Sequence, residues 1–305
     1  MSRKILITGG TGFIGYHLAK RCLKLSWSVT SLSTKKPKKY RKLKKVKYLI
    51  CDISNKRKLR QKINTNYDYV VNLAGYVDHS NKLKTMKSHF YGCKNISSFF
   101  LRSKIKKFIQ IGSSIEYGKI SSPQKENSYN NQKTYSIYGT SKLQSTKYLL
   151  KLNKKFNFPV SILRLYLVYG PNQDENRVVP ITIKNSIKNN NFDCSSGLQI
   201  RDFLYIDDLI KAILKTLKSK NSNGEIFNIG SGKPIKVKNI ILKICKLVGQ
   251  GKPKFGVIKF RKDEIKKLYP SIKKSKKVLG WKPLVEINLG LKKTIKHYKK
   301  SFHII

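Results

Sequence analysis

The sequence predicts an α/β protein built on a doubly wound parallel sheet. Short apolar runs alternate with segments whose apolar residues recur at helical spacing, and this rhythm persists through residues 4–164. A glycine-rich turn joins the first expected strand to the first expected helix. Alternating strands and helices of this kind favour one sheet with helices on both faces.

The expected elements follow from this periodicity in chain order. With 305 residues, the chain is long enough for one large domain or two modest ones. After Tyr169-Gly170-Pro171 the pattern loosens into polar loops and shorter elements. We expect strands at 4–8, 29–32, 47–51, 67–73, 107–111, 160–164 and 226–229, and helices at 13–25, 84–102, 138–152 and 207–217.

Positive charge dominates the composition. The chain has 66 Lys+Arg against 15 Asp+Glu, which gives a formal net charge of +51. Lysine is spread over nearly every expected helix and loop, and it outnumbers arginine, the residue preferred for bidentate phosphate and base recognition. We therefore attribute the charge to compositional bias and expect no nucleic-acid partner, although such a field attracts phosphorylated ligands.

Cysteine usage and the apolar runs indicate where the protein works. No apolar run is long enough to cross a membrane, and the first one is too short for a signal peptide. The cysteines contain no C-x-x-C pair and the histidines show no ligand spacing, so we expect a cytoplasmic protein without a metal site. The five cysteines are Cys22, Cys51, Cys93, Cys194 and Cys245.

The turn after the first strand has the pattern of a phosphate-binding loop. It reads Thr8-Gly9-Gly10-Thr11-Gly12-Phe13-Ile14-Gly15. Its glycines permit a tight turn, close approach of the backbone to a pyrophosphate, and close helix–sheet packing, while amides at the helix N-terminus face the phosphates. The turn predicts dinucleotide binding through Gly9, Thr11, Gly12, Phe13, Ile14 and Gly15.

The end of the second strand indicates which dinucleotide is bound. NAD-binding proteins place an acidic side chain there for the ribose hydroxyls. Here the run Ser31-Leu32-Ser33-Thr34-Lys35-Lys36 contains no acid, and Ser33, Thr34 and Lys35 can receive a 2′-phosphate. We therefore expect NADP, with NAD as the alternative.

Tyr138 and Lys142 form a Y-x-x-x-K pair, and a spacing of four places both on one helical face. A neighbouring ammonium favours the tyrosinate, so we expect the phenol pKa to fall from about 10 toward neutrality, which suits proton exchange. One βα unit earlier, a strand ends in Ser113-Ser114. Its hydroxyls lie at the carboxyl edge of the sheet, where open α/β sheets bind ligands.

These motifs resemble those of extended short-chain dehydrogenases/reductases, in the nucleotide-sugar epimerase/dehydratase group. The resemblance implies a Rossmann domain, a smaller interleaved C-terminal substrate domain, and a helical homodimer interface. We expect 1–170 plus about 207–233 to bind the dinucleotide, and about 171–206 plus 234–305 to bind substrate. The matching pieces run in family order: TGGTGFIG at 8–15, CDIS at 51–54, NLAG at 72–75, GSSIEYG at 112–118, YGTSK at 138–142, LRLYLVYGP at 163–171, RDFLYIDDL at 201–209, FNIGSG at 227–232 and LGWKP at 279–283.

The resemblance also implies roles for individual residues. Tyr138 would be the general acid/base, Lys142 would orient the nicotinamide ribose and tune Tyr138, and Ser113 would hydrogen-bond the reacting sugar oxygen. The remaining positions match family contacts to cofactor or substrate: Asp52 and Ile53 to adenine, Ala74 and Gly75 to the cofactor wall, Ser114 to the substrate, and Arg201 and Arg261 to the substrate phosphates.

The sequence departs from the family patterns in three respects. Ser114 and Ile115 stand where dehydratases have an acidic pair, and Glu116 falls one place late. Leu167 replaces an asparagine common in family epimerases, and His89 occupies a position that is often asparagine. These departures count against 4,6-dehydration and weaken a standard 4-epimerase assignment.

We therefore expect an NAD(P)-dependent oxidoreductase that reduces the keto group of a nucleotide-diphosphate sugar, with a 4-keto-6-deoxy sugar nucleotide as the favoured substrate. The alternative is a nucleotide-sugar 4-epimerase similar to UDP-glucose 4-epimerases. A 4,6-dehydratase and a non-catalytic nucleic-acid-binding protein are less favoured. We expect no membrane partner.

Overall fold

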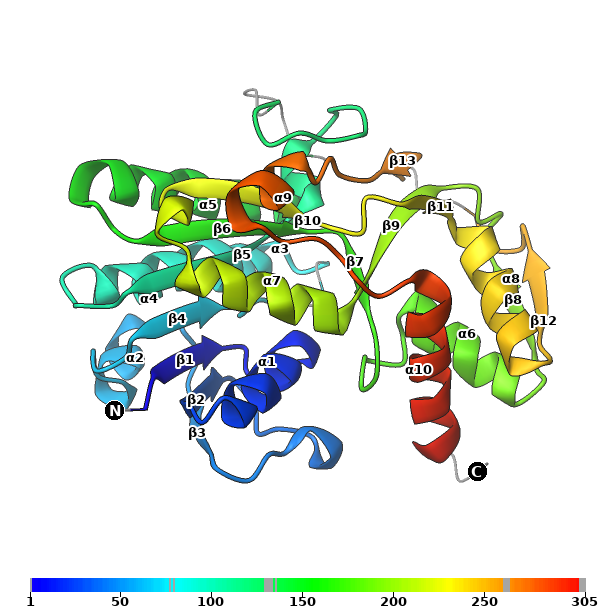
Figure 1. The fold of residues 1–305 in the computed structure, drawn as a ribbon, viewed down its shortest axis with the longest axis horizontal. Helices are drawn as coiled ribbons and strands as arrows, with labels where there is room; N and C mark the ends of the chain where they lie inside the picture. Colours follow the sequence, from blue (N-terminus) through cyan, green and yellow to red (C-terminus); the bar gives the residue numbers. More distant parts are fainter. Residues whose placement is uncertain are drawn as a thin grey trace.

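A seven-stranded parallel sheet forms the centre of the computed structural model, which describes residues 2–76, 78, 80–128, 134, 136–259 and 264–301 (Figure 1). The strand order is β10-β6-β5-β4-β1-β2-β3. This arrangement confirms the predicted doubly wound α/β fold. The strands are β1 (Lys4–Thr8), β2 (Ser28–Ser33), β3 (Val46–Ile50), β4 (Tyr69–Asn72), β5 (Lys107–Ser113), β6 (Val160–Leu165) and β10 (Glu225–Ile229).

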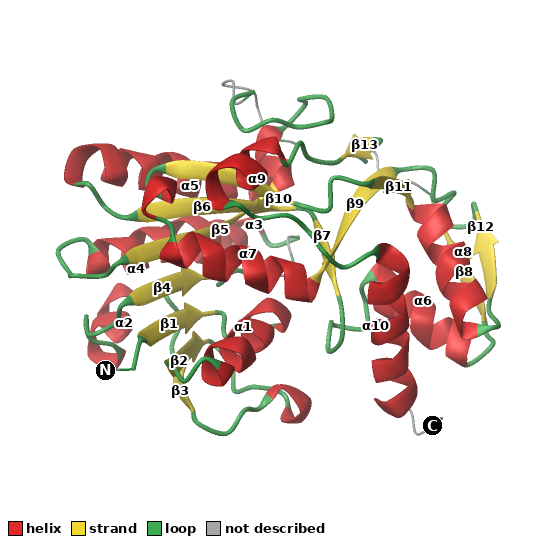
Figure 2. Cartoon of the chain, viewed as in Figure 1, coloured by secondary structure: helices red, strands yellow, loops and turns green. Residues whose placement is uncertain are grey.

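Helices cover both faces of this sheet (Figure 2). Successive residues of a strand point to opposite faces, so Ile5 and Ile7 pack into one apolar cluster and Leu6 into the other. The first cluster includes α1 (Phe13–Lys24) and α7 (Ile206–Lys218). The second includes α2 (Lys56–Lys62), α4 (Gly92–Phe100) and α5 (Ile137–Phe156).

The helix predicted over 84–102 is present over residues 82–100, with a π-helical turn in its middle. The structure has α3 (Lys82–Met86), then a π-helical turn at Lys87–Tyr91, and then α4. The turn carries His89, whose ring lies against Gly75 at a place where a Cβ would be only 2.0 Å from the His89 Cε1 atom. A π-helical turn is a frequent feature of functional sites, and this one borders the candidate active site.

Most of the remaining elements pack beside the carboxyl end of the central sheet, whereas α9 (Lys273–Leu279) packs against β10 and α7 (Figure 1). A second sheet has the order β11-β9-β13, with β7 also paired to β9, and β8 pairs with β12. The loosened pattern after Pro171 hid one ten-residue helix, α6. These elements are β7 (Leu167–Tyr169), α6 (Val178–Ile187), β8 (Asn191–Cys194), β9 (Ile200–Tyr205), β11 (Pro234–Lys236), α8 (Val237–Val248), β12 (Lys252–Phe255), β13 (Lys267–Leu268), α9 (Lys273–Leu279) and α10 (Ile287–Ser301).

Two further features bear on the sequence-based expectations. Within the described ranges, the helices lack the combination of length and apolar character that a bilayer crossing requires. All five cysteines are free thiols, and four of them are buried. Burial raises the pKa of Cys22 and of Cys93 to about 12, so neither thiol is a reactive thiolate.

Candidate active site

The glycine turn between β1 and α1 is shaped as a cradle. Gly9 has φ +71°, and a Cβ on Gly15 would lie 2.5 Å from the Cα of Gly10, so both positions require glycine. A Cβ on Gly12 would meet only the Gly9 carbonyl oxygen, at 3.2 Å, among the described atoms within 4 Å. Gly12 is the N-cap of α1. The open space beside this helix N-terminus fits a dinucleotide pyrophosphate.

The end of β2 lies beside this cradle. The Ser33 hydroxyl accepts a hydrogen bond from the Thr11 amide at 3.2 Å, which ties the strand end to the turn. Thr34 and Lys35 follow as exposed residues. The run 28–36 contains no acidic side chain, so hydroxyls and ammonium groups surround the place where the adenosine ribose of a dinucleotide would sit.

Asp52 and Ile53 follow the neighbouring strand β3, which pairs with β2 in parallel register. Asp52 is exposed, and its Oδ1 accepts a hydrogen bond from the Ser54 amide at 2.8 Å. Ile53 is buried, and a Cβ on Gly92 would meet its Cγ1 at 2.7 Å. Both residues therefore stand at the carboxyl edge of the sheet, next to the end of β2.

Ser113, Tyr138 and Lys142 come together at the carboxyl end of β5. Ser113 ends that strand, and its hydroxyl is hydrogen-bonded to the Tyr138 phenol. Tyr138 lies in the first turn of α5, which Ser136 caps by accepting the Gly139 amide at 3.2 Å. The Lys142 Nζ lies 5.9 Å from the Tyr138 ring centroid and donates to the Ile111 carbonyl at 2.7 Å.

Burial sets the protonation of this cluster. Burial raises the pKa of Tyr138 above its usual value, and the hydrogen bond with Ser113 opposes that rise. The charge of Glu116 raises the pKa of Tyr138 further, and Arg177 is the cation that lowers it. The prediction that neighbouring groups lower the pKa of Tyr138 is therefore wrong. The Lys142 ammonium is directed to a carbonyl, and burial lowers its own pKa.

His89 forms a wall behind Tyr138. The two rings meet edge to face, with centroids 5.0 Å apart and planes at 69°. The His89 Nε2 donates to the Tyr76 carbonyl at 3.1 Å. Ala74 and Gly75 follow β4, the His89 ring lies against Gly75, and the Ala74 amide donates to Asn72 Oδ1 at 3.3 Å. Sequence reasoning assigned His89 no role, yet it shapes the space beside the phenol.

Glu116 is the site residue whose place the sequence reasoning missed. Its Oε1 accepts the Ser113 amide at 2.7 Å, and its Oε2 accepts the Thr146 hydroxyl at 2.7 Å and the Arg164 Nε at 3.0 Å. The spacing Ser113-x-x-Glu116 is the capping-box pattern, and the structure contains that box. This spacing was the sequence signal from which the position of Glu116 could have been predicted. It shows that the carboxylate binds its own turn and the protein core.

Of the two predicted phosphate-binding arginines, the one that the structure describes, Arg201, is not a free cation. Arg201 lies in β9, where its guanidinium forms an ion pair with Glu264 and donates to the Ile200 carbonyl at 2.8 Å. Arg261 lies outside the described residues. Ser114 is buried in the 3₁₀ turn directly after Ser113. In the described part of the chain, no cluster of three His, Cys, Asp or Glu side chains could hold a metal ion.

The sequence matches the NAD dependent epimerase/dehydratase family over residues 5–230. The chain belongs to this family. The match confirms the resemblance and identifies an NAD(P)-dependent enzyme of the extended short-chain dehydrogenase/reductase class.

Relatives of this family member have several different activities. It is 31% identical to a putative UDP-glucose 4-epimerase of Methanocaldococcus jannaschii over 97% of this chain and 99% of the relative. It is 28% identical to human dTDP-D-glucose 4,6-dehydratase over 99% of this chain and 91% of the relative. The UDP-glucuronic acid 4-epimerase of Bacillus cereus, solved with UDP-glucuronic acid and NAD, is 28% identical with a TM-score of 0.87, covering 98% and 99% of the two chains.

Proposed function

We propose that this family member uses NADPH to reduce the keto group of a nucleotide-diphosphate sugar, with a 4-keto-6-deoxy sugar as substrate. The observation that carries the proposal is the acid-free end of β2. A carboxylate there would repel a 2′-phosphate, whereas Ser33, Thr34 and Lys35 offer it hydroxyls and a positive charge. A phosphorylated dinucleotide is suited to a reductase that consumes one hydride, a pair of electrons, in each turnover.

Tyr138 and Ser113 supply the two donors for the reacting oxygen. Because burial holds the Tyr138 phenol protonated at neutral pH, the phenol donates its proton to the sugar oxygen as that oxygen gains charge. The Ser113 hydroxyl, already hydrogen-bonded to the phenol, stabilises the same oxygen. The bound nicotinamide supplies the hydride. Lys142 orients the nicotinamide ribose from the next turn of α5.

The other predicted contacts complete the proposed site. Ser114, Arg201 and Arg261 contact the nucleotide sugar, and Arg201 exchanges its Glu264 partner for a substrate phosphate. The cofactor lies along the glycine cradle and the carboxyl ends of β2, β3 and β4. Its contacts are Gly9, Thr11, Gly12, Phe13, Ile14, Gly15, Ser33, Thr34, Lys35, Asp52, Ile53, Ala74, Gly75, Tyr138 and Lys142.

The proposed organisation of the whole chain follows from these sites. Residues 1–170 with about 207–233 bind the dinucleotide, and about 171–206 with 234–305 bind the sugar nucleotide. We propose a homodimer in the cytoplasm. The free state of all five thiols supports a reducing compartment.

A second candidate is nucleotide-sugar 4-epimerisation with a tightly held NAD. The 31% identity to a putative UDP-glucose 4-epimerase favours it. The same Ser113, Tyr138 and Lys142 would serve it. Dehydration fits less well because Ser114 and Ile115 are not acidic, and because both oxygens of Glu116 bind buried donors.

Coenzyme oxidation tests the two candidates directly. Purified protein is mixed with NADPH or NADH and a panel of nucleotide 4-keto-6-deoxy sugars. We expect stoichiometric oxidation, faster with NADPH, and no turnover by Tyr138→Phe despite retained cofactor binding. Ser33→Asp keeps an acceptor for the Thr11 amide and should shift the preference toward NADH. Interconversion of UDP-sugars without added coenzyme would instead identify an epimerase.

A further inference from the structure

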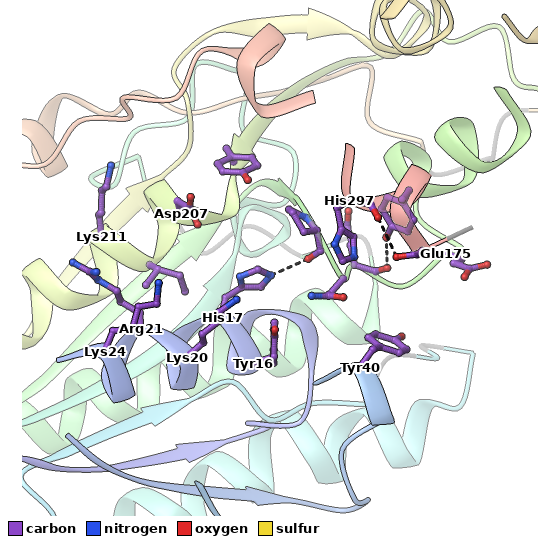
Figure 3. Close-up of a pocket in the computed structure, with 17 residues that line it drawn as sticks. Tyr16, His17, Lys20, Arg21, Lys24, Tyr40, Glu175, Asp207, Lys211 and His297 are labelled. Atoms are coloured by element: carbon purple, nitrogen blue, oxygen red, sulfur yellow. Dashed lines mark hydrogen bonds between the residues drawn. The ribbon is translucent and has the colours of Figure 1, made fainter. Parts of the chain in front are cut away.

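A cavity of about 1010 Å³ lies between α1, α7 and α10, on the side of α1 that faces α10 (Figure 3). The loop Pro171–Glu175 after β7 closes one side of it. Binding cavities for small molecules have volumes of roughly 300–1,000 Å³, so this one has room for a ligand of nucleotide size. The described residues that line it include none that we assign to the active site.

The α1 wall of the cavity is cationic. Lys20, Arg21 and Lys24 occupy one face of the helix, and Lys211 faces them from α7 (Figure 3). Lys20, Arg21 and Lys24 form no ion pair with any carboxylate in the described structure.

The acidic groups of the lining leave this charge largely unbalanced. The lining includes Asp207 and Glu175. Glu175 is paired with Lys184 at 2.5 Å. Lys211 has a counter-charge in Asp208, 3.6 Å away. Three cations that are unpaired in the described structure, Lys20, Arg21 and Lys24, therefore face a cavity whose lining includes Asp207, and such an arrangement concentrates small polyanions.

The opposite part of the cavity is aromatic. Tyr298 is buried and fixed by the hydrogen bond from its hydroxyl to the Gln173 carbonyl at 2.6 Å. The His17 Nε2 donates to the Pro171 carbonyl at 2.8 Å, and His297 lies beside Tyr298 (Figure 3). Tyr40 is 52% exposed and stands at the rim. Rings held in this way offer faces on which a planar base can stack.

We propose that this cavity is a second ligand site, for a nucleoside polyphosphate, separate from the cofactor cleft. The phosphates lie against Lys20, Arg21, Lys24 and Lys211, and the base lies against the aromatic side lined by Tyr40 and Tyr298. A free polyphosphate shares the charge of this ligand but lacks its base. Tyr40 therefore distinguishes the two ligands, because only the nucleoside polyphosphate has a base that can stack on its ring.

Binding of ATP and of inorganic tripolyphosphate to the full chain, measured calorimetrically at physiological salt, tests the site. We expect one saturable site, tighter for ATP than for tripolyphosphate, and weakened for ATP alone by Tyr40→Ala. The triple variant Lys20→Gln/Arg21→Gln/Lys24→Gln should raise both dissociation constants by at least about tenfold, because charge-assisted contacts to phosphate are lost. All three side chains are exposed, so the fold should persist.

Two matched variants separate the cavity from other sources of binding. Lys56→Gln/Arg57→Gln/Lys58→Gln removes the same charge from exposed positions of α2 and should change ATP affinity by less than about twofold. Equal weakening in both triple variants would assign binding to the general positive field. Loss of ATP binding in Gly12→Ala, with retention in the cavity variant, would place the nucleotide in the cofactor cleft. Either result overturns the proposal, as does affinity for RNA without saturable ATP binding.

Discussion

Glu116 and Arg164 form an ion pair whose side chains are both fully buried, with Glu116 Oε2 3.0 Å from the Arg164 Nε. The pair lies directly beneath Ser113, because the other carboxylate oxygen accepts the Ser113 amide. The Arg164 guanidinium also lies 4.3 Å from the Tyr117 ring centroid. One carboxylate thus joins β5, β6 and α5 at the base of the candidate active site.

Removing the negative charge from this pair should destabilise the fold strongly. Glu116→Gln leaves the buried Arg164 charge without its counter-charge, and breaking buried pairs of this kind costs about 3–5 kcal/mol of unfolding free energy. Urea denaturation measures the change. Glu286→Gln is the control, because the Lys233–Glu286 pair has side chains 72% and 68% exposed. We expect that control to cost less than about 1 kcal/mol.

The two buried residues should also be energetically coupled. Arg164→Met leaves the Glu116 carboxylate buried without its counter-charge, and Glu116→Gln does the same to the Arg164 guanidinium. The double variant removes both charges from the interior. Its loss of stability should be smaller than the sum of the single losses by about 0.5–3 kcal/mol. Strictly additive losses in this double-mutant cycle would show that the pair contributes no mutual stabilisation.

The pH dependence of the reaction should reflect the raised pKa of Tyr138. Keto reduction uses the protonated phenol. Titration of Tyr138 should therefore leave kcat/KM for reduction unchanged from about pH 6 to about pH 9. The reverse oxidation needs the tyrosinate and should accelerate as the pH rises. Initial rates in both directions test this, and a steep loss of reduction between about pH 7 and about pH 9 contradicts it.

Much of the fold could be predicted because it depends on local sequence patterns. The strand at residues 4–8 and the glycine turn after it depend on neighbouring residues, as does the placement of Tyr138 and Lys142 on one helical face. The direction of the Tyr138 pKa could not be predicted in this way, because it depends on burial by distant segments. The Glu116–Arg164 and Arg201–Glu264 pairs join residues 48 and 63 positions apart. No local spacing indicates such contacts.

Asp207 and Asp208 should differ sharply in their effect on stability. Adjacent helical residues point in different directions, and the structure exposes Asp207 while it buries Asp208 completely. The Asp208 Oδ2 accepts the Leu284 and Val285 amides at 2.9 and 2.8 Å, which fastens the segment before α10.

Asp208→Ala leaves both amides without that acceptor and should cost at least about 2 kcal/mol of unfolding free energy. Asp207→Ala removes an exposed acid from the first turn of α7 and should cost less than about 1 kcal/mol. Thermal and urea unfolding of the two variants give the comparison. Similar losses would mean that the buried hydrogen bonds do not hold the C-terminal segment.

Alanine substitutions at Gly12 and Gly15 should separate cofactor binding from folding. Gly12 has φ −76° and ψ 176°, a conformation open to alanine, and its Cβ would enter the proposed pyrophosphate space. Gly12→Ala should change the unfolding free energy by less than about 1 kcal/mol yet weaken cofactor binding by at least about tenfold. Gly15→Ala drives a Cβ into the Gly10 backbone and should cost at least about 2 kcal/mol of stability. Cofactor titration and urea unfolding distinguish the two outcomes, and undiminished cofactor affinity in Gly12→Ala would exclude this cradle as the pyrophosphate site.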